Sequence, residues 1–350
     1  MTSQRKPVVS FLGPVASYTH QAVRQAFSES TWEFSPAVTI DGRFWSMHRS
    51  RDVRTDFPGK DVFDQVQSGQ VQAGVVPFEN STNGSVSFTL DNLADRTNHY
   101  PDITVDGETY VDVHHCLVGH KSPVPAVEDI AEGSGTCTPT ATDPSPSKPR
   151  SRPLASLKHI QRLYSHPQAF GQCTAFISTY LKSVEIFEVS STSKAAEIVS
   201  KDTTGTWAAI SSELAAKLHG LDFLGKSIED REDNTTRFFV IGKNTAGPKD
   251  LEKTEKAVAE KGSKSLVSFT VPHTSPGALA DVLSCFRTFD INLTSINTLP
   301  SLVKPFQYIF FIEFEGHKYV DPQGRVKGAL EKISRVAESW RWLGSWERYI

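Results

Sequence analysis

The sequence predicts an α/β fold with a smaller ferredoxin-like unit toward its carboxyl-terminal end. A short apolar strand at 8–12 is followed by a glycine turn and by apolar residues at helical spacing over 18–27. Short strands and helices then alternate as far as residue 241, which is typical of one or two mainly parallel sheets. Beyond residue 264 the order becomes βαββαβ, which fits a split-βαβ unit.

The individual elements follow from apolar periodicity and turn signals. In the first half we expect strands at 73–78 and 109–119 and helices at 61–68 and 85–96. Further along we expect a helix at 167–181, strands at 184–189, 207–210 and 237–241, and helices from Ser193 and at 213–219. The terminal unit is expected to have strands at 266–271, 292–298, 307–314 and 342–346, and helices at 277–289 and 325–339.

Two segments look like interruptions of the folded parts. Residues 121–156 hold seven of the chain's 20 prolines and almost no large apolar residues, so we expect a disordered insertion within a domain. Residues 244–264 are rich in lysine and read as a linker that is helical at most. The sequence therefore predicts a main domain at 7–243 and a second domain at 265–350.

Composition argues against several classes of partner. The 350 residues carry a net charge of -3, so no overall field attracts nucleic acid or anionic membrane. No apolar stretch approaches the roughly 20 residues of a membrane span. The amino-terminal residues lack the pattern of a signal peptide, and the four cysteines show no CxxC spacing. We expect a cytoplasmic protein with free thiols.

Polar segments stand where strands end or helices begin. These are GPVASYTH, PFENSTNGS, SHPQAFGQC, SSTSKAA and DNTTRFF. In α/β sheets the carboxyl ends of strands and the following helix starts are the usual ligand sites, and helix starts suit anions. The alternative for each segment alone is an ordinary cap or turn, since Asn, Ser and Thr also belong there.

Taken together, the segments resemble a known family. The motifs GPVASYTHQAV, GVVPFENSTNGSV, YSHPQAFGQC, SSTSKAAE and IEDREDNTTRFFVIG occur in the order found in prephenate dehydratases. The terminal unit is similar to an ACT domain. The resemblance implies a two-lobed catalytic region folded like a type II periplasmic binding protein, with one lobe at 7–85 plus 230–243, the other at 86–229, and substrate between them.

The reaction implied by the resemblance converts prephenate to phenylpyruvate with loss of carbon dioxide and hydroxide. Aromatisation of the ring drives the step, so the expected needs are oriented hydrogen-bond donors and a proton for the departing hydroxyl. We expect no cofactor and no metal. In agreement, the sequence has no GxGxxG, no P-loop and no HExxH.

The resemblance also assigns roles to individual residues. Thr236 matches the essential threonine and is expected to supply or relay the proton. The substrate-binding candidates are Asn80, Ser81, Ser165, Gln172, Ser17, Thr19, Ser191, Thr192, Arg237 and Phe238. The alternatives are that Thr236 caps a strand and that Arg237 pairs with a nearby carboxylate. His20 and His166 are expected to be packed histidines that bond backbone groups, and Cys173 to be buried and inert.

The ACT-like unit implies a regulatory site for L-phenylalanine and a homodimer or homotetramer. The candidate regulatory residues are Pro276, Gly277, Ala278, Leu279 and Asn297. The family's ESRP motif falls where this chain has Asn297, Thr298, Leu299 and Pro300, so the glutamate and the arginine are missing. Leucine cannot replace the paired bonds of an arginine. Ordinary phenylalanine sensitivity and a purely structural pairing role both stay open.

Two other functions compete with the first. Arogenate dehydratase acts on a substrate with an amine in place of the keto group, and one sequence does not separate the two activities. A non-catalytic metabolite sensor could combine the same cleft with an ACT-like unit. A sensor has no need of a proton donor at Thr236, which this chain retains.

Overall fold

The computed structural model describes residues 5–37, 61–122, 148–243, 251–272 and 274–349. The chain forms two compact units: unit 1 contains Met1–Leu12, Ala22–Tyr110 and Arg237–Ile350, and unit 2 contains Gly13–Gln21 and Val111–Thr236. These bounds differ from the predicted lobes, because residues 86–110 belong to unit 1 whereas residues 13–21 and 230–236 belong to unit 2. Helix α3 explains part of the difference, since Leu90 and Leu93 pack into the unit 1 core.

Unit 1 is built on a mixed sheet with strand order β2-β1-β3-β11-β5, and a short strand β4 pairs with β3. Strand β1 runs parallel to both β2 and β3. The strands are β1 Val8–Leu12, β2 Glu33–Ala37, β3 Ala73–Asn80, β4 Gly84–Ser85, β5 Ile103–Asp112 and β11 Thr235–Lys243. The helices are α1 Tyr18–Ala26, α2 Val62–Gln67 and α3 Ser87–Ala94.

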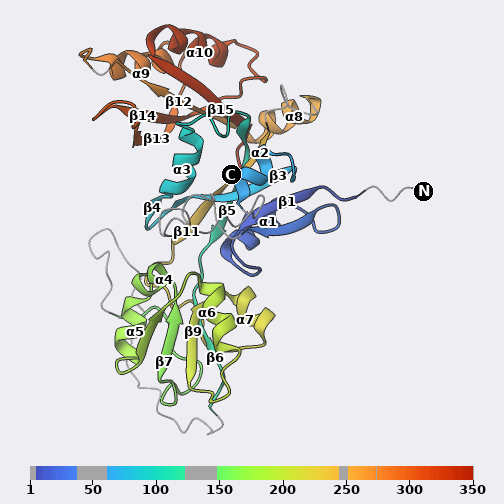
Figure 1. The fold of residues 1–350 in the computed structure, drawn as a ribbon, viewed down its shortest axis with the longest axis vertical. Helices are drawn as coiled ribbons and strands as arrows, with labels where there is room; N and C mark the ends of the chain where they lie inside the picture. Colours follow the sequence, from blue (N-terminus) through green and yellow to red (C-terminus); the bar gives the residue numbers. More distant parts are fainter. Residues whose placement is uncertain (1–4, 38–60, 123–147, 244–250, 273, 350) are drawn as a thin grey trace, which may run out of the picture. The chain divides into compact units, whose positions relative to one another are not determined.

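The carboxyl-terminal part of unit 1 is an antiparallel sheet of order β13-β14-β12-β15, which is the predicted ferredoxin-like arrangement. Its elements are α8 Leu251–Lys261, β12 Ser263–Thr270, α9 Ala278–Thr288, β13 Leu293–Pro300, β14 Tyr308–Glu315, α10 Arg325–Val336 and β15 Ser339–Glu347. Helices α9 and α10 cover one face of this sheet, and α3 lies on the other side (Figure 1).

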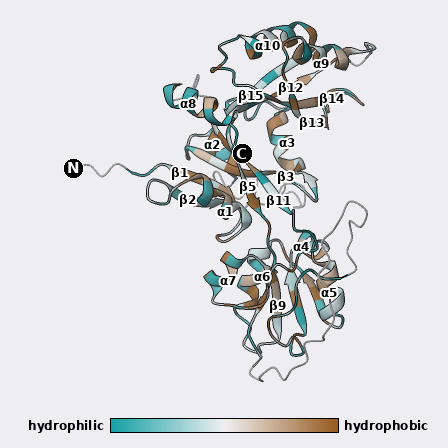
Figure 2. Cartoon of the chain, turned by 180° about the vertical axis from the view of Figure 1, so that it is seen from behind, coloured by the Kyte–Doolittle hydropathy of each residue, from teal (hydrophilic) through white to brown (hydrophobic). Residues whose placement is uncertain are grey.

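The two faces of the ferredoxin-like sheet enter different cores because strand side chains alternate. Val267, Phe269 and Ile312 pack under α9 and α10. Leu266, Phe311 and Trp346 instead join Phe78, Val105 and Phe239 in the core of the first sheet. The ferredoxin-like sheet and the β1–β5 part therefore share one continuous core. Helix α8, by contrast, has no buried residue and is largely hydrophilic in Figure 2.

Unit 2 is a five-stranded sheet of order β10-β6-β9-β7-β8. Strand β7 is parallel to β8 and β9, whereas β6 is antiparallel to β9 and β10. The strands are β6 Cys116–Gly119, β7 Arg162–Ser165, β8 Glu185–Glu188, β9 Trp207–Ser211 and β10 Asp222–Gly225. The helices are α4 Pro167–Gly171, α5 Thr174–Tyr180, α6 Thr192–Val199 and α7 Glu213–His219.

The fold class is confirmed, and several elements are corrected. The strand predicted at 109–119 is two strands, β5 and β6, separated by residues 113–115. The helix predicted at 167–181 is two helices, because Gln172 ends α4 and Cys173 precedes α5. Strands β2, β7 and β10 were not predicted, since four or five residues give little periodic signal.

The predicted insertion at 121–156 is described only in part, because residues 123–147 lie outside the described residues. The boundary at 156 is corrected, since residues 148–156 make specific contacts in unit 2. The Arg150 guanidinium lies 3.1 Å from Glu229 Oε1, and the Leu154 N–H donates to the Leu224 carbonyl at 2.7 Å.

Candidate functional site

The ENSTNGS segment forms a tight turn between β3 and β4. Asn80 ends β3, and its side-chain Oδ1 accepts hydrogen bonds from the N–H groups of Thr82 (3.0 Å) and Asn83 (2.9 Å). Gly84 has a φ of +77°, a conformation that glycine adopts without strain. Asn80 thus holds the turn, and Ser81 is exposed at its tip.

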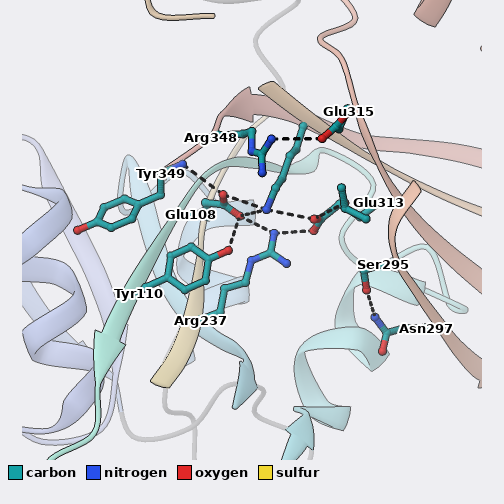
Figure 3. A network of polar contacts seen from close by, with 11 residues as sticks. Glu108, Tyr110, Arg237, Ser295, Asn297, Glu313, Glu315, Arg348 and Tyr349 are labelled. Carbon is teal, nitrogen blue, oxygen red and sulfur yellow. Dashed lines mark hydrogen bonds and ion pairs between the residues drawn. The ribbon is translucent and has the colours of Figure 1, made fainter. Parts of the chain in front are cut away.

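Four buried charges, including Arg237 of the TRF motif, lie together in unit 1 (Figure 3). Arg237 of β11 pairs with Glu108 of β5 and with Glu313 of β14. Lys264 Nζ of β12 lies 3.3 Å from Glu108 and 3.4 Å from Glu313. The two cations balance the two carboxylates. We call these four residues the buried quartet.

The charged forms of the quartet side chains are stabilised by their oppositely charged neighbours and not by solvent. Burial alone would raise the pKa of Glu108, but Arg237 and Lys264 outweigh it and lower that pKa. Burial would lower the pKa of Arg237, but Glu313 and Glu108 raise it. The guanidinium also lies over the Phe239 ring at 5.0 Å, and Phe238 beside it is 2% exposed. Arg237 therefore makes the carboxylate pairing that the sequence left as an alternative.

Several of the predicted hydroxyl residues gather at one edge of the unit 2 sheet. Ser165 ends β7, and Ser191 and Thr192 follow β8, which is parallel to β7. Ser165 Oγ donates to the Ile210 carbonyl of the neighbouring strand β9 at 2.8 Å. Ser211 at the end of β9 donates to the Thr192 carbonyl at 2.8 Å. The carboxyl ends of β7, β8 and β9 therefore meet there.

The turn before α1 lies against the same edge. Ser193 Oγ donates to the Val15 carbonyl at 2.8 Å, and Ser212 Oγ donates to the Ala16 carbonyl at 3.1 Å. Ser17 Oγ accepts from the His20 N–H at 3.2 Å, and Ser191 Oγ accepts from the Lys194 N–H at 3.0 Å. Both serines therefore act as helix caps. The starts of α1, α6 and α7 are brought together, with Thr19 in the first turn of α1.

Gln172 belongs to a buried network that the sequence did not reveal. Its Oε1 lies 2.8 Å from His115 Nε2, and the Tyr18 hydroxyl lies 3.1 Å from His115 Nδ1. The His115 N–H donates to Glu229 Oε2 at 2.8 Å. Burial lowers the pKa of His115, so the ring is neutral at pH 7. The other contacts hold the His115 ring, and the ring holds the Gln172 amide oxygen.

The other titratable candidates behave as expected. His20 Nδ1 accepts from the Ala16 N–H at 3.0 Å, and His166 Nδ1 accepts from the Gln168 N–H at 3.3 Å. Cys173 is fully buried, and burial raises the pKa of its thiol well above the usual range, which keeps it unreactive. Cys116, Cys173 and Cys285 are free thiols, and Cys137 lies outside the described residues.

Comparison with known proteins decides the family. The profile of the prephenate dehydratase family matches residues 58–246. The chain belongs to the prephenate dehydratase family. It is 30% identical over its whole length to the bifunctional chorismate mutase/prephenate dehydratase of Aquifex aeolicus, of which it covers 76%. It is 31% identical to the probable prephenate dehydratase of Saccharomyces cerevisiae, with 97% of this chain and 96% of the yeast protein covered.

A solved structure extends the similarity to the fold. The prephenate dehydratase of Arthrobacter aurescens, determined in complex with L-Phe, superposes with a TM-score of 0.71 at 25% identity and covers 97% of this chain and 90% of its own. The type II periplasmic-binding-protein-like region followed by a ferredoxin-like unit is thus the fold of this family member.

The candidate regulatory residues lie in two places in the ACT-like unit, at the start of α9 and on β13. Gly277, with a φ of +80°, precedes α9, next to the exposed Pro276, the buried Ala278 and the partly buried Leu279. Asn297 lies on β13, where its Oδ1 accepts a hydrogen bond from Ser85 Oγ at 2.6 Å. Ser85 is the last residue of the GVVPFENSTNGS motif. Asn297 therefore contacts the GVVPFENSTNGS motif.

Sequence reasoning missed the long-range partners of the motif residues. Glu313 had a signal, because a carboxylate stands within the apolar strand YIFFIEFE. His115 had a weaker one, since a second histidine, His114, directly precedes it between β5 and β6. Among the described residues, no group of three or more His, Cys, Asp or Glu side chains could hold a metal ion. No helix in the described part of the chain has the length and hydropathy of a membrane span.

Proposed function

We propose that this chain catalyses the decarboxylating dehydration of prephenate to phenylpyruvate in L-phenylalanine biosynthesis. The observation that carries the proposal is the family match over residues 58–246 together with an intact DNTTRFF string. Carbon dioxide and hydroxide leave as the ring becomes aromatic, and a proton delivered to the hydroxide forms water. The chain must therefore orient a dicarboxylate and deliver one proton.

Thr236 is the proposed source or relay of that proton. It lies on β11 next to Thr235, whose own hydroxyl donates to Asp112 Oδ1 at 2.7 Å. The hydroxyl of threonine is a weak acid, so the role requires a dry site with oriented dipoles.

The proposed substrate-binding residues fall into two groups. In unit 2 they are the hydroxyl and amide residues at the sheet edge, Ser17, Thr19, Ser165, Gln172, Ser191 and Thr192. The helix starts gathered there carry partial positive charge, which suits the carboxylates of prephenate. In unit 1 they are Asn80 and Ser81. We assign Arg237 and Phe238 to the support of β11, because Arg237 is paired with two carboxylates and Phe238 is buried.

The test is the Thr236→Ala variant with Thr235→Ala as its matched control. We expect the kcat for phenylpyruvate formation to fall about 10²–10⁴-fold in Thr236→Ala with KM nearly unchanged, because the lost interaction belongs to the transition state. Thr235→Ala is expected to retain most of kcat. The ultraviolet absorbance of phenylpyruvate measures both, with arogenate assayed alongside prephenate. A Thr236→Ala protein with full turnover would refute the assignment.

We also propose L-phenylalanine as an effector and a homodimer or homotetramer as the assembly. The L-Phe complex of the Arthrobacter protein supports the first. Exposed apolar side chains on the ACT-like unit support the second, since contiguous patches of this kind mark interfaces. They are Ile296 at 53%, Leu302 at 77%, Val303 at 75% and Phe306 at 79% exposure. Light scattering measures the assembly, and a monomer at micromolar concentration would contradict it.

A further inference from the structure

Two polar side chains on one face of the ACT-like sheet, Glu313 and Asn297, contact the TRF motif and the ENSTNGS segment. On β14, Ile309 and Phe311 face the core shared with β3, β5 and β11, and Glu313 continues the same alternation. Glu313 pairs there with Arg237 of the TRF motif. On the neighbouring strand β13, Asn297 accepts the hydrogen bond from Ser85, the last residue of the ENSTNGS segment.

We propose that Glu313 is a positioning residue for the dehydratase reaction: it holds Arg237, and through Arg237 it fixes the backbone of β11 that carries Thr236. This inference rests on the proposed function of Thr236. In this proposal the ACT-like unit contributes to the rate of the reaction through Glu313, whether or not an effector is bound.

The buried quartet has the construction that such a role needs. The side chains of Glu108, Glu313 and Arg237 are 1%, 2% and 9% exposed, so none of these charges exchanges its partner for water. Thr294 Oγ1 donates to Glu313 Oε1 at 2.7 Å, and the backbone N–H of Tyr349 donates to Glu108 Oε1 at 3.3 Å. The carboxylates that hold Arg237 are therefore themselves held in place (Figure 3).

The quartet consists of two neutral ion pairs, so one pair can be replaced without leaving a net charge on the other. Arg237 and Glu108 come from the first sheet and are neutral as a pair, and Lys264 and Glu313 come from the ACT-like sheet and are likewise neutral. The ACT-like pair adds no net charge to the motif. A buried ion pair contributes little to stability compared with apolar side chains of the same size. Its geometric effect is different, because Glu313 gives the guanidinium a second fixed anchor from another sheet.

The anchor reaches Thr236 through the strand itself. Arg237 and Thr236 are adjacent on β11, and adjacent side chains of a strand point to opposite faces. Holding the Arg237 side chain on one face therefore sets the direction of the Thr236 side chain on the other. A misplacement of about 1 Å at a reacting group can cost about 100-fold in rate.

The experiment replaces the ACT-like half of the quartet by neutral side chains of similar size, in the full-length double variant Glu313→Gln/Lys264→Met. We expect kcat to fall at least about fivefold with KM within about twofold, at a temperature well below the melting temperature of the variant. Circular dichroism is expected to match that of the unchanged chain. Glu313→Gln alone leaves an uncompensated cation, so we expect it to lose melting temperature as well as kcat.

The matched control is Glu315→Gln, two residues along the same strand. Glu315 pairs with Arg348 at 3.2 Å in a half-exposed position away from Arg237, so kcat is expected to be unchanged. A folded double variant with the kcat of the control would overturn the inference alone. An unchanged chain that forms no phenylpyruvate would overturn the proposed function, and the inference with it.

Discussion

The variant Gly344→Ala tests whether the ACT-like sheet and the first sheet form one body. Gly344 lies on β15 with a φ of +144°. A Cβ atom built there would lie 2.0 Å from the Val105 carbonyl oxygen and 2.9 Å from the Val105 carbonyl carbon. An ordinary contact needs about 3.4 Å, so β15 and β5 would have to separate by more than 1 Å.

The expected cost has two parts. An L-residue in this backbone conformation costs about 1–3 kcal/mol. Separating two packed strands costs about 1–3 kcal/mol more, since Leu343 and Trp346 would leave the shared core. We therefore expect the free energy of unfolding to fall by about 2–6 kcal/mol.

The control is Gly324→Ala, at another glycine with positive φ. Gly324 precedes α10 with a φ of +66°, and a Cβ there would have nothing within 4 Å. Its substitution carries the conformational cost alone, about 1–2 kcal/mol. Urea unfolding followed by tryptophan fluorescence measures both variants, because Trp346 packs against Phe239 at 5.4 Å between ring centroids. If Gly344→Ala loses no more stability than Gly324→Ala, β15 does not pack on β5 as described.

Two further predictions concern acid stability and the effector. Burial lowers the pKa of His317 from 6.5 to about 4, and its Nδ1 accepts from the N–H groups of Tyr319 and Val320. Between these two pH values the unfolded chain binds a proton that the folded chain does not, so stability falls as the pH falls, by about 3 kcal/mol in full. His317→Asn keeps a hydrogen-bond acceptor but does not titrate. Between pH 7 and pH 4 its free energy of unfolding in urea should therefore fall by about 3 kcal/mol less than that of the unchanged chain. Equal pH profiles for the two proteins would contradict the lowered pKa of His317. Phenylalanine should change the rate of dehydration. The effect should be weaker than at a site with the arginine of the ESRP motif, since this chain has Leu299 at that position. An unaltered rate at millimolar phenylalanine would contradict the effector proposal.

The sequence was sufficient for elements whose signal is local. Helix α7 was predicted with its exact bounds because Ser212 caps it and Gly220 ends it. Ser191 and Thr192 were also located from local patterns, since they lie between the strand predicted at 184–189 and the helix predicted from Ser193, whereas β7, which ends at Ser165, was not predicted. The break at residues 113–115 could not be predicted, because its cause lies far away in sequence. There the His115 backbone bonds Glu229, which comes 114 residues later.

The contacts that complete the candidate site depend on sheet register, which no single segment encodes. Glu313 meets Arg237 only because β14 directs that residue toward β11, and a slip of one residue would turn Glu313 under α9 and α10. The resemblance indicated which strings form the candidate site. It did not indicate which of their residues face each other.

The TRF motif combines a residue proposed for catalysis, Thr236, with a residue that is paired inside unit 1, Arg237. The division between the two units falls between Thr236 and Arg237 on β11, and between Tyr110 and Val111 on the paired strand β5. Arg237 has its charge balanced inside unit 1, so it has no net attraction left for the anionic substrate. We therefore propose that the two carboxylates of prephenate are recognised by helix starts, hydroxyls and amides. Such groups carry no net charge, so substrate affinity should vary less steeply with salt than it would at an arginine site.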